Sequence, residues 1–79
     1  MSNKEKYNQA FMETLEVSEN ELAGLTYTGI PAWDSVGHMA LMAAVEDAFD
    51  IMMDTDDIID LSSYEKGKEI LTNNYSIEF

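Results

Sequence analysis

The feature that most restricts how this chain can fold is the absence of any lysine or arginine between Tyr7 and Glu65. The chain has four Lys and Arg residues against sixteen Asp and Glu, which gives a formal net charge of −12. Repulsion among unpaired carboxylates opposes compaction. However, 46 % of the residues are hydrophobic, a proportion typical of a folded domain. We therefore expect a small folded domain that has a basic partner, a bound cation, or both.

The same charge limits the classes of partner. Proteins that bind nucleic acids or anionic membranes use cations to neutralise phosphates, so neither class is expected here. There is no cysteine, which excludes disulfides and thiolate metal sites. No run approaches the ~18 apolar residues of a membrane span, and the first residues lack the apolar core of a signal peptide. We expect a monomeric, cytoplasmic protein.

The spacing of apolar residues predicts an all-α fold. Tyr7, Phe11 and Leu15 recur every four residues, and Leu41, Val45 and Phe49 do the same further along the chain, as on the buried face of a helix. The prediction is one domain over residues 1–79, a small four-helix bundle with a long loop between the first two helices and a short third helix. The expected helices cover about 3–16, 35–51, 56–61 and 63–73, with 74–79 frayed.

Capping residues mark where the helices should begin. Ser2 with Glu5 has the form of a capping box, and Ser18 and Ser62 are each followed by Glu at the same distance. The box at Ser18 predicts one short turn and the box at Ser62 the start of the last helix. Asp34–Ser35 and Thr55 are expected to cap the second and third helices.

The segment from Gly24 to Trp33 breaks the helical pattern. It contains two glycines and the only proline, so we expect a long loop there. Ile30 and Trp33 are too apolar to remain in water, and we expect them to hold the loop against the core.

Ser35 and His38 lie three residues apart on one predicted helix, which brings a nucleophilic dyad into consideration. The G-x-S-x-G pattern of a nucleophile elbow fails, because Trp33 occupies the position of the first glycine. There is no second histidine, and a chain of this size has little room for an oxyanion hole. We therefore expect no enzyme activity. His38 is expected at the surface, bordering whatever docks beside Ser35.

The acidic run after residue 53 resembles a calcium-binding loop in part. Asp54, Asp56 and Glu65 match its first, third and twelfth positions. Ile58 and Ile59 occupy the fifth and sixth, where an oxygen ligand and a glycine are needed. The run is therefore interpreted as a solvated acidic face, and no metal site is expected.

Ser35 allows two interpretations. A phosphoester on a hydroxyl at a helix N-terminus would be stabilised by free amide N–H groups and by the helix dipole. The simpler interpretation is that Ser35 or Asp34 only caps the helix. The spacing of these residues does not decide between the two.

The stretch from Trp33 to Ile51, WDSVGHMALMAAVEDAFDI, resembles the signature of the acyl and peptidyl carrier proteins. That signature is an Asp-Ser-(Leu or similar) triplet, followed by apolar and acidic positions that end in Glu-x-x-Phe. The matching residues are Asp34, Ser35, Val36, Leu41, Val45, Glu46 and Phe49. The expected order of helices and the acidic composition extend the resemblance weakly over the whole chain.

The resemblance implies that Ser35 receives 4′-phosphopantetheine from a phosphopantetheinyl transferase. The thiol of this arm would carry an acyl or aminoacyl group as a thioester between a loading enzyme and downstream transferases or synthases. Asp34 would cap the helix and help to orient the loading enzyme. The resemblance further implies a partner-binding surface made by Val36, Met39, Ala40, Ala43, Glu46 and Asp47, the last two pairing with Arg or Lys.

Two departures from the family pattern qualify the resemblance. Fatty-acid carriers usually have acidic residues two and five positions after the serine, where this chain has Gly37 and Ala40. The start of the expected helix is therefore less acidic and more apolar than in that subfamily. Trp33 before the Asp, and His38 and Met39 after the Gly, resemble stand-alone carriers of specialised pathways, such as polyketide, nonribosomal peptide or polysaccharide assembly. The alternative is an acidic helical adaptor that binds a basic protein without a prosthetic group. Small and pliable residues (Met42, Ala44, Met52, Met53 and Gly67) suit either a cavity for an acyl chain or adaptable core packing.

Overall fold

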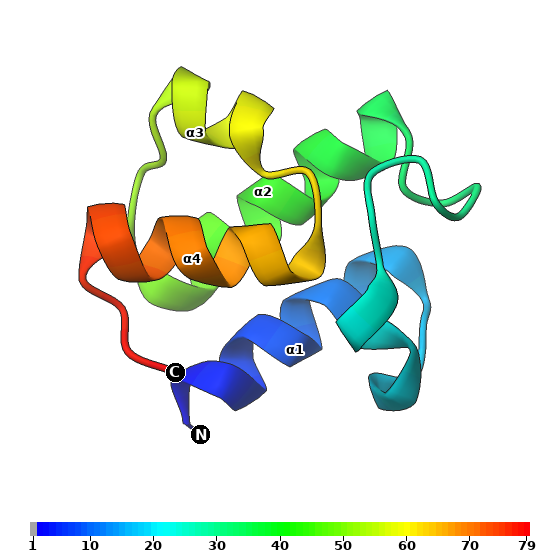
Figure 1. Ribbon diagram of the computed structural model, residues 1–79, viewed down its shortest axis with the longest axis horizontal. Helices are drawn as coiled ribbons and strands as arrows, with labels where there is room; N and C mark the ends of the chain where they lie inside the picture. The colour runs from blue at the N-terminus through cyan, green and yellow to red at the C-terminus, as the bar shows by residue number, and fades with distance from the viewer. Residues whose placement is uncertain (1) are drawn as a thin grey trace.

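The computed structural model describes residues 2–79, and Figure 1 shows how their helices surround a common core. The elements in chain order are α1 (Asn3–Leu15), the 3-10 helix η1 (Glu19–Gly24), α2 (Ser35–Phe49), α3 (Thr55–Asp60) and α4 (Tyr64–Tyr75). Over residues 2–79 the only strand-like feature is an isolated antiparallel bridge between Thr26 and Ser63. The prediction of an all-helical domain is confirmed.

Helix α1 begins with the predicted capping box. The Ser2 hydroxyl accepts a hydrogen bond from the Glu5 N–H at 3.1 Å, and the Glu5 carboxylate accepts one from the Ser2 N–H at 3.1 Å. Its apolar stripe of Tyr7, Phe11 and Leu15 is buried, and α1 packs against α2. Burial of each such side chain contributes about 1.5–3 kcal/mol. Helix formation and core formation in this segment therefore depend on the same residues.

Trp33 and Ile30 attach the connection before α2 to this core, as predicted. Trp33 is fully buried, and the Phe11 ring meets it edge-on with ring centroids 5.4 Å apart. Ile30 is half-buried and packs against the core. The connection between α1 and α2 contains the helix η1 over residues 19–24, so only part of it is a loop. This helix is longer than the single turn expected after Ser18.

Helix α2 ends earlier than the predicted residue 51. It stops at Phe49 because Asp50 adopts a left-handed backbone conformation with φ of 53°. Leu41 and Val45 are buried as expected, but Met52 lies beyond the helix and is 88 % exposed. The suggestion that Met52 lines a cavity or packs adaptably in the core is therefore wrong.

The last two helices begin at slightly different residues from those predicted. The N-cap of α3 is Asp54, and Thr55 is its first helical residue. The N-cap of α4 is Ser63, whose hydroxyl accepts a hydrogen bond from the Lys66 N–H at 2.9 Å. The prediction of Ser62 as the cap is wrong by one residue, because the backbone of Ser62 instead accepts a hydrogen bond from the Tyr27 N–H at 2.8 Å.

Residues 74–79, which we expected to fray, are packed against the rest of the domain. Helix α4 continues to Tyr75, and Ile77 is buried, with its N–H donating to the Leu71 carbonyl at 3.1 Å. The Asn3 side-chain amide donates to the Glu78 carbonyl at 2.9 Å, so the two ends of the chain lie side by side (Figure 1). The tail contributes apolar contacts that short-range sequence patterns do not indicate.

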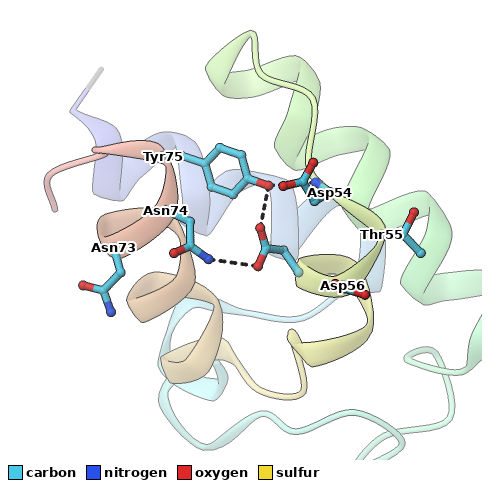
Figure 2. A pocket seen from close by; sticks show the side chains of 7 residues that line it. Asp54, Thr55, Asp56, Asn73, Asn74 and Tyr75 are labelled. Carbon is cyan, nitrogen blue, oxygen red and sulfur yellow. Dashed lines mark hydrogen bonds between the residues drawn. The ribbon is translucent and has the colours of Figure 1, made fainter.

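A polar cluster joins α3 to the end of α4 (Figure 2). The Asp57 carboxylate accepts hydrogen bonds from the Asn74 side-chain amide at 2.9 Å and from the Tyr75 hydroxyl at 2.7 Å. The Tyr75 oxygen in turn accepts from the Asp54 N–H at 2.8 Å. Partial burial, followed by the hydrogen bond to Asp57, raises the pKa of Tyr75. These bonds hold the N-terminal turn of α3 against the last turn of α4.

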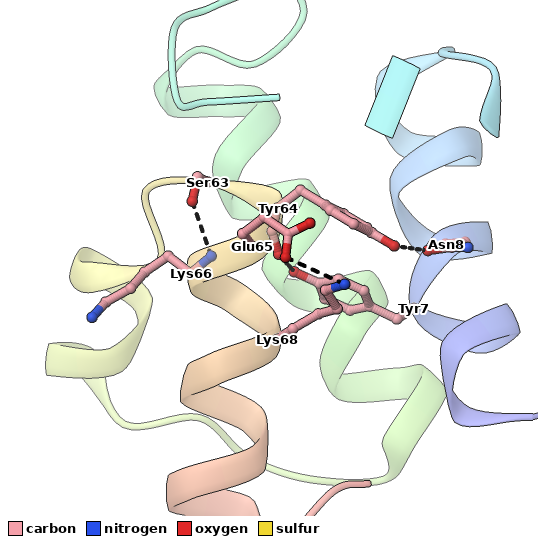
Figure 3. A network of polar contacts seen from close by, with 7 residues as sticks. All are labelled: Tyr7, Asn8, Ser63, Tyr64, Glu65, Lys66 and Lys68. Atoms are coloured by element: carbon pink, nitrogen blue, oxygen red, sulfur yellow. Dashed lines mark hydrogen bonds and ion pairs between the residues drawn. The ribbon is translucent and has the colours of Figure 1, made fainter. Parts of the chain in front are cut away.

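A second polar cluster is buried between α1 and α4 (Figure 3). The Tyr7 hydroxyl donates to the Tyr64 carbonyl at 2.7 Å, and the Tyr64 hydroxyl donates to the Asn8 side-chain oxygen. Burial raises the pKa of both tyrosines, and the charge of Glu65 acts in the same direction. Gly67 is required beside this cluster, because a Cβ there would overlap the Tyr7 hydroxyl.

Ion pairs contribute little to this fold. Over residues 2–79 there are two, Lys66–Glu69 at 3.7 Å and Lys68–Glu65 at 3.4 Å, and both lie within α4. Exposed pairs of this kind contribute at most about 1 kcal/mol each. The fold is therefore held by its apolar core and by the buried tyrosine cluster.

Candidate functional site

The segment that leads to Ser35 is fixed by backbone hydrogen bonds to the connection between α3 and α4. The Tyr27 N–H donates to the Ser62 carbonyl at 2.8 Å, and the Tyr64 N–H donates to the Leu25 carbonyl at 3.0 Å. Within the segment, the Thr28 N–H donates to the Trp33 carbonyl at 2.9 Å. Bonds between chain segments of this kind restrict the conformations of the loop that precedes α2.

His38 joins this segment to both α2 and α3. Its Nδ1 accepts a hydrogen bond from the Trp33 indole N–H at 2.9 Å, and its Nε2 lies 2.7 Å from the Ile58 carbonyl oxygen. Because an indole nitrogen only donates, Nδ1 carries no proton, and Nε2–H donates to Ile58.

These two bonds decide what His38 is able to do. It is half-buried rather than a surface residue as expected, because both ring nitrogens are satisfied by protein groups. Neither nitrogen is free to take a proton from Ser35. The arrangement therefore provides no Ser-His dyad.

The N-terminus of α2 leaves the Ser35 hydroxyl free of any capping role. Asp34 is the N-cap, and its carboxylate accepts a hydrogen bond from the Gly37 N–H at 2.8 Å. Ser35 is the first helical residue and is exposed. Its Oγ lies 3.2 Å from the Tyr27 hydroxyl oxygen. Asp34 is thus sufficient to cap the helix, and the Ser35 hydroxyl projects beside the loop.

Gly37 allows the loop to lie close against the first turn of α2. A Cβ at this position would overlap the carbonyl oxygen of Ala32. The space that a side chain at residue 37 would need is filled by the backbone of the loop. Glycine at this position is therefore a packing requirement.

An apolar pocket of about 330 Å³ opens beside Ser35, between the N-terminal part of α2, the loop and α3. It contains no lysine, arginine or acidic side chain. The residues that line it are Tyr27, Ser35, His38, Met39, Ile58, Ile59, Leu61 and Ser62. The sequence patterns do not indicate that Tyr27, Ile59 and Ser62 line a common pocket. These residues come from three segments that only the tertiary fold brings together.

Most of the predicted partner-binding residues lie on one exposed side of α2. Val36 is 79 % exposed and Met39 59 %, and Ala40, Ala43 and Asp47 are exposed as well. Ile59 of α3, 71 % exposed, lies beside Met39 at the rim of the pocket. Met39 and Ile59 line the same pocket as Ser35, so apolar side chains border its hydroxyl.

Glu46 differs from the other predicted partner residues. It is half-buried, and its carboxylate accepts a hydrogen bond from the Met53 N–H at 2.8 Å. This bond holds the segment that follows α2. Asp47 is therefore the better exposed of the two predicted acidic contacts.

The polar cluster around Asp57 lines a larger, open pocket of about 740 Å³ (Figure 2). Its lining residues are Asp54, Thr55, Asp56, Asp57, Asn73, Asn74 and Tyr75. Throughout residues 2–79, no three His, Asp or Glu side chains are placed to hold a metal ion together. The hydrogen bonds of Asp57 are instead made to neighbouring protein groups.

Comparisons with protein-family models, with curated proteins and with solved structures found no match to this chain. Among the helices formed by residues 2–79, none is both long and apolar enough to cross a membrane.

Proposed function

We propose that this protein is an acyl carrier whose Ser35 accepts 4′-phosphopantetheine from coenzyme A through a phosphopantetheinyl transferase. The observation that carries the proposal is the exposed Ser35 hydroxyl, which is not used for capping and stands at the start of α2 beside an apolar pocket. An anionic phosphodiester on Ser35 would lie at the N-terminal end of the helix dipole. The carrier-like sequence from Trp33 to Ile51 supports the same function.

The residues around Ser35 fit such a group. The pocket is lined mainly by apolar side chains and offers about 330 Å³ beside the attachment point. When bound, the group supplies a thiol that holds an acyl or aminoacyl chain as a thioester. This chain has no cysteine of its own for that purpose. Its residues would present the attachment point and shield part of the arm from water.

The loading step would place the nucleophile on this chain and the catalytic groups on its partner. Ser35 Oγ forms a bond to the β-phosphorus of coenzyme A. The bond from that phosphorus to the bridging oxygen of adenosine 3′,5′-bisphosphate breaks, and the Ser35 proton passes to a base of the transferase. His38 is excluded as this base because both its ring nitrogens are hydrogen-bonded within the domain.

Partner enzymes would bind the exposed side of α2. The contact surface combines the apolar side chains of Val36, Met39 and Ile59 with the small residues Ala40 and Ala43. The first turn of α2 contains no acidic residue, whereas Asp47 lies further along the helix.

This distribution assigns different tasks to charge and to packing. Acidic charge would speed and orient encounters with basic enzymes, while apolar packing beside Ser35 would select among them. The apolar first turn of α2 favours a carrier of a specialised pathway. We propose that this carrier works as a cytoplasmic monomer with a loading enzyme and with downstream transferases or synthases.

The test is the intact mass of the folded protein after incubation with coenzyme A and a promiscuous phosphopantetheinyl transferase. We expect the wild-type mass to increase by one phosphopantetheine. The Ser35→Ala variant should show no increase. The matched control is Ser62→Ala, which removes an exposed hydroxyl from the other side of the same pocket and should be modified like the wild type. A folded wild-type protein that gains no mass would contradict the proposal and favour the acidic adaptor.

A further inference from the structure

We propose that Tyr27 is the positioning residue for the group attached to Ser35. Its phenolic O–H would orient the Ser35 hydroxyl before modification and donate a hydrogen bond to the phosphodiester afterwards. This inference rests on the proposed function and assigns a role to a residue outside the carrier-like stretch.

The Tyr27 side chain is held in place although it is 38 % exposed. Its ring meets the His38 ring at a centroid distance of 5.3 Å and an angle of 66°, and the Trp33 ring at 6.4 Å and 82°. Its backbone N–H donates to the Ser62 carbonyl at 2.8 Å. These contacts fix the ring on the wall of the pocket and place its hydroxyl oxygen 3.2 Å from Ser35 Oγ.

Modification of Ser35 determines the direction of this hydrogen bond. In the unmodified protein either hydroxyl is able to donate. Once Oγ is bonded to phosphorus it has no hydrogen, so Tyr27 becomes the donor. The phosphorus lies one bond beyond Oγ and its other oxygens two bonds beyond, on the side of the group that adjoins the Tyr27 phenol.

A phosphodiester on Ser35 would need a neutral hydrogen-bond donor, because no positively charged side chain lies in the pocket beside it. No lysine or arginine lines the pocket, and Lys66 and Lys68 pair with Glu69 and Glu65 in α4. A phosphodiester adds further negative charge to a chain of net charge −12. The Tyr27 O–H is the side-chain donor that the structure places within 3.2 Å of Ser35 Oγ. Hydrogen bonds to charged acceptors are stronger than neutral ones.

The test compares Tyr27→Phe with the wild type in two measurements. The substitution keeps the ring and its contacts with His38 and Trp33, so the variant should fold and still be modified completely. We expect the ³¹P NMR resonance of its phosphodiester to move from the wild-type position. The kcat/KM of modification should fall about two- to tenfold, as for the loss of one hydrogen bond.

The matched control is Tyr75→Phe, which removes a phenolic hydroxyl that is bonded to Asp57 in α3 and does not line the pocket beside Ser35. This variant should leave the ³¹P resonance and kcat/KM at their wild-type values. An unchanged resonance and an unchanged kcat/KM in fully modified Tyr27→Phe would overturn the role of Tyr27 while the carrier function stands. A wild-type protein that is never modified would overturn both.

Discussion

Two clusters in this domain are built around tyrosine hydroxyls, and they differ in whether these hydroxyls are buried or exposed. Between α1 and α4, the hydroxyls of Tyr7 and Tyr64 are buried and hydrogen-bonded to protein groups (Figure 3). At the start of α2, the Tyr27 hydroxyl is exposed and faces Ser35 across 3.2 Å. The first cluster holds the fold together, whereas the second leaves the Ser35 hydroxyl accessible.

The difference teaches that burial, rather than residue type, separates the polar groups that hold the fold from those that stay accessible. A buried hydroxyl without a partner costs about 1–3 kcal/mol, so the contacts of Tyr7 and Tyr64 leave little freedom for substitution. An exposed hydroxyl exchanges protein partners for water at little cost. The region around Ser35 is therefore able to change partners while the region around Tyr7 is not.

The largest effect should come from adding a methyl group beside the buried cluster. Gly67→Ala places a Cβ that overlaps the Tyr7 hydroxyl and meets Leu61 closely. Overpacking and displacement of the Tyr7–Tyr64 bond should lower the free energy of unfolding by about 2–3 kcal/mol, despite the better helix propensity of alanine. Urea unfolding followed by circular dichroism measures this loss.

The control is Gly24→Ala in η1, where an added Cβ meets no atom within 4 Å. Its free energy of unfolding should stay within about 0.5 kcal/mol of the wild type. Equal stabilities for the two variants would show that the buried cluster does not constrain the fold.

A smaller effect is expected at high pH. Burial raises the pKa of Tyr7 and Tyr64 above the ordinary value of 10.0, so these groups stay protonated in the folded protein when the unfolded chain ionises. The unfolded state then binds fewer protons, and stability must fall as the pH rises above about 10, with a limiting slope of about 1.4 kcal/mol per pH unit from Tyr7.

Tyr7→Phe isolates the contribution of one buried tyrosine to this pH dependence. Its free energy of unfolding should fall less steeply between about pH 10 and 11 than that of the wild type. Chemical denaturation at a series of pH values gives both slopes. Identical slopes would show that Tyr7 ionises equally in the folded and unfolded states.

The smallest effect on stability is expected at the exposed cluster. In Gly37→Ala the new Cβ overlaps the Ala32 carbonyl, so the loop that precedes Ser35 must shift. The gain in helix propensity offsets only part of the strain of this backbone shift, so stability should fall by about 1 kcal/mol. The rate of Ser35 modification should also fall. A wild-type rate would show that the position of the loop is unimportant for modification.

Local sequence patterns were sufficient to predict the four α-helices and the main residues of their buried faces, but not the extent of η1 or every helix end. The Ser2–Glu5 capping box and the spacing of Tyr7, Phe11 and Leu15 act within one or two helical turns, so short-range chemistry determines them. Which of Asp34 and Ser35 caps α2 stayed open in the sequence, and the structure assigns the cap to Asp34.

Contacts between distant segments could not be predicted from these patterns. The bond from Tyr7 to Tyr64 spans 57 residues, and the tail packs because Phe79 meets the Tyr7 ring at a centroid distance of 5.2 Å. The surroundings of His38 were missed for the same reason, since its partner Ile58 lies twenty residues away. The position of Tyr27 beside Ser35 depends likewise on how the loop is attached to Ser62.

The measurement that tests the central claim most directly is the site of modification, determined by peptide mass spectrometry after treatment with coenzyme A and the transferase. The chain offers five other serines for comparison, Ser2, Ser18, Ser62, Ser63 and Ser76. The proposed function predicts one phosphopantetheine on the peptide that contains Ser35 and none on the other five. A modification found at any other serine, or at none in the folded protein, would contradict the account.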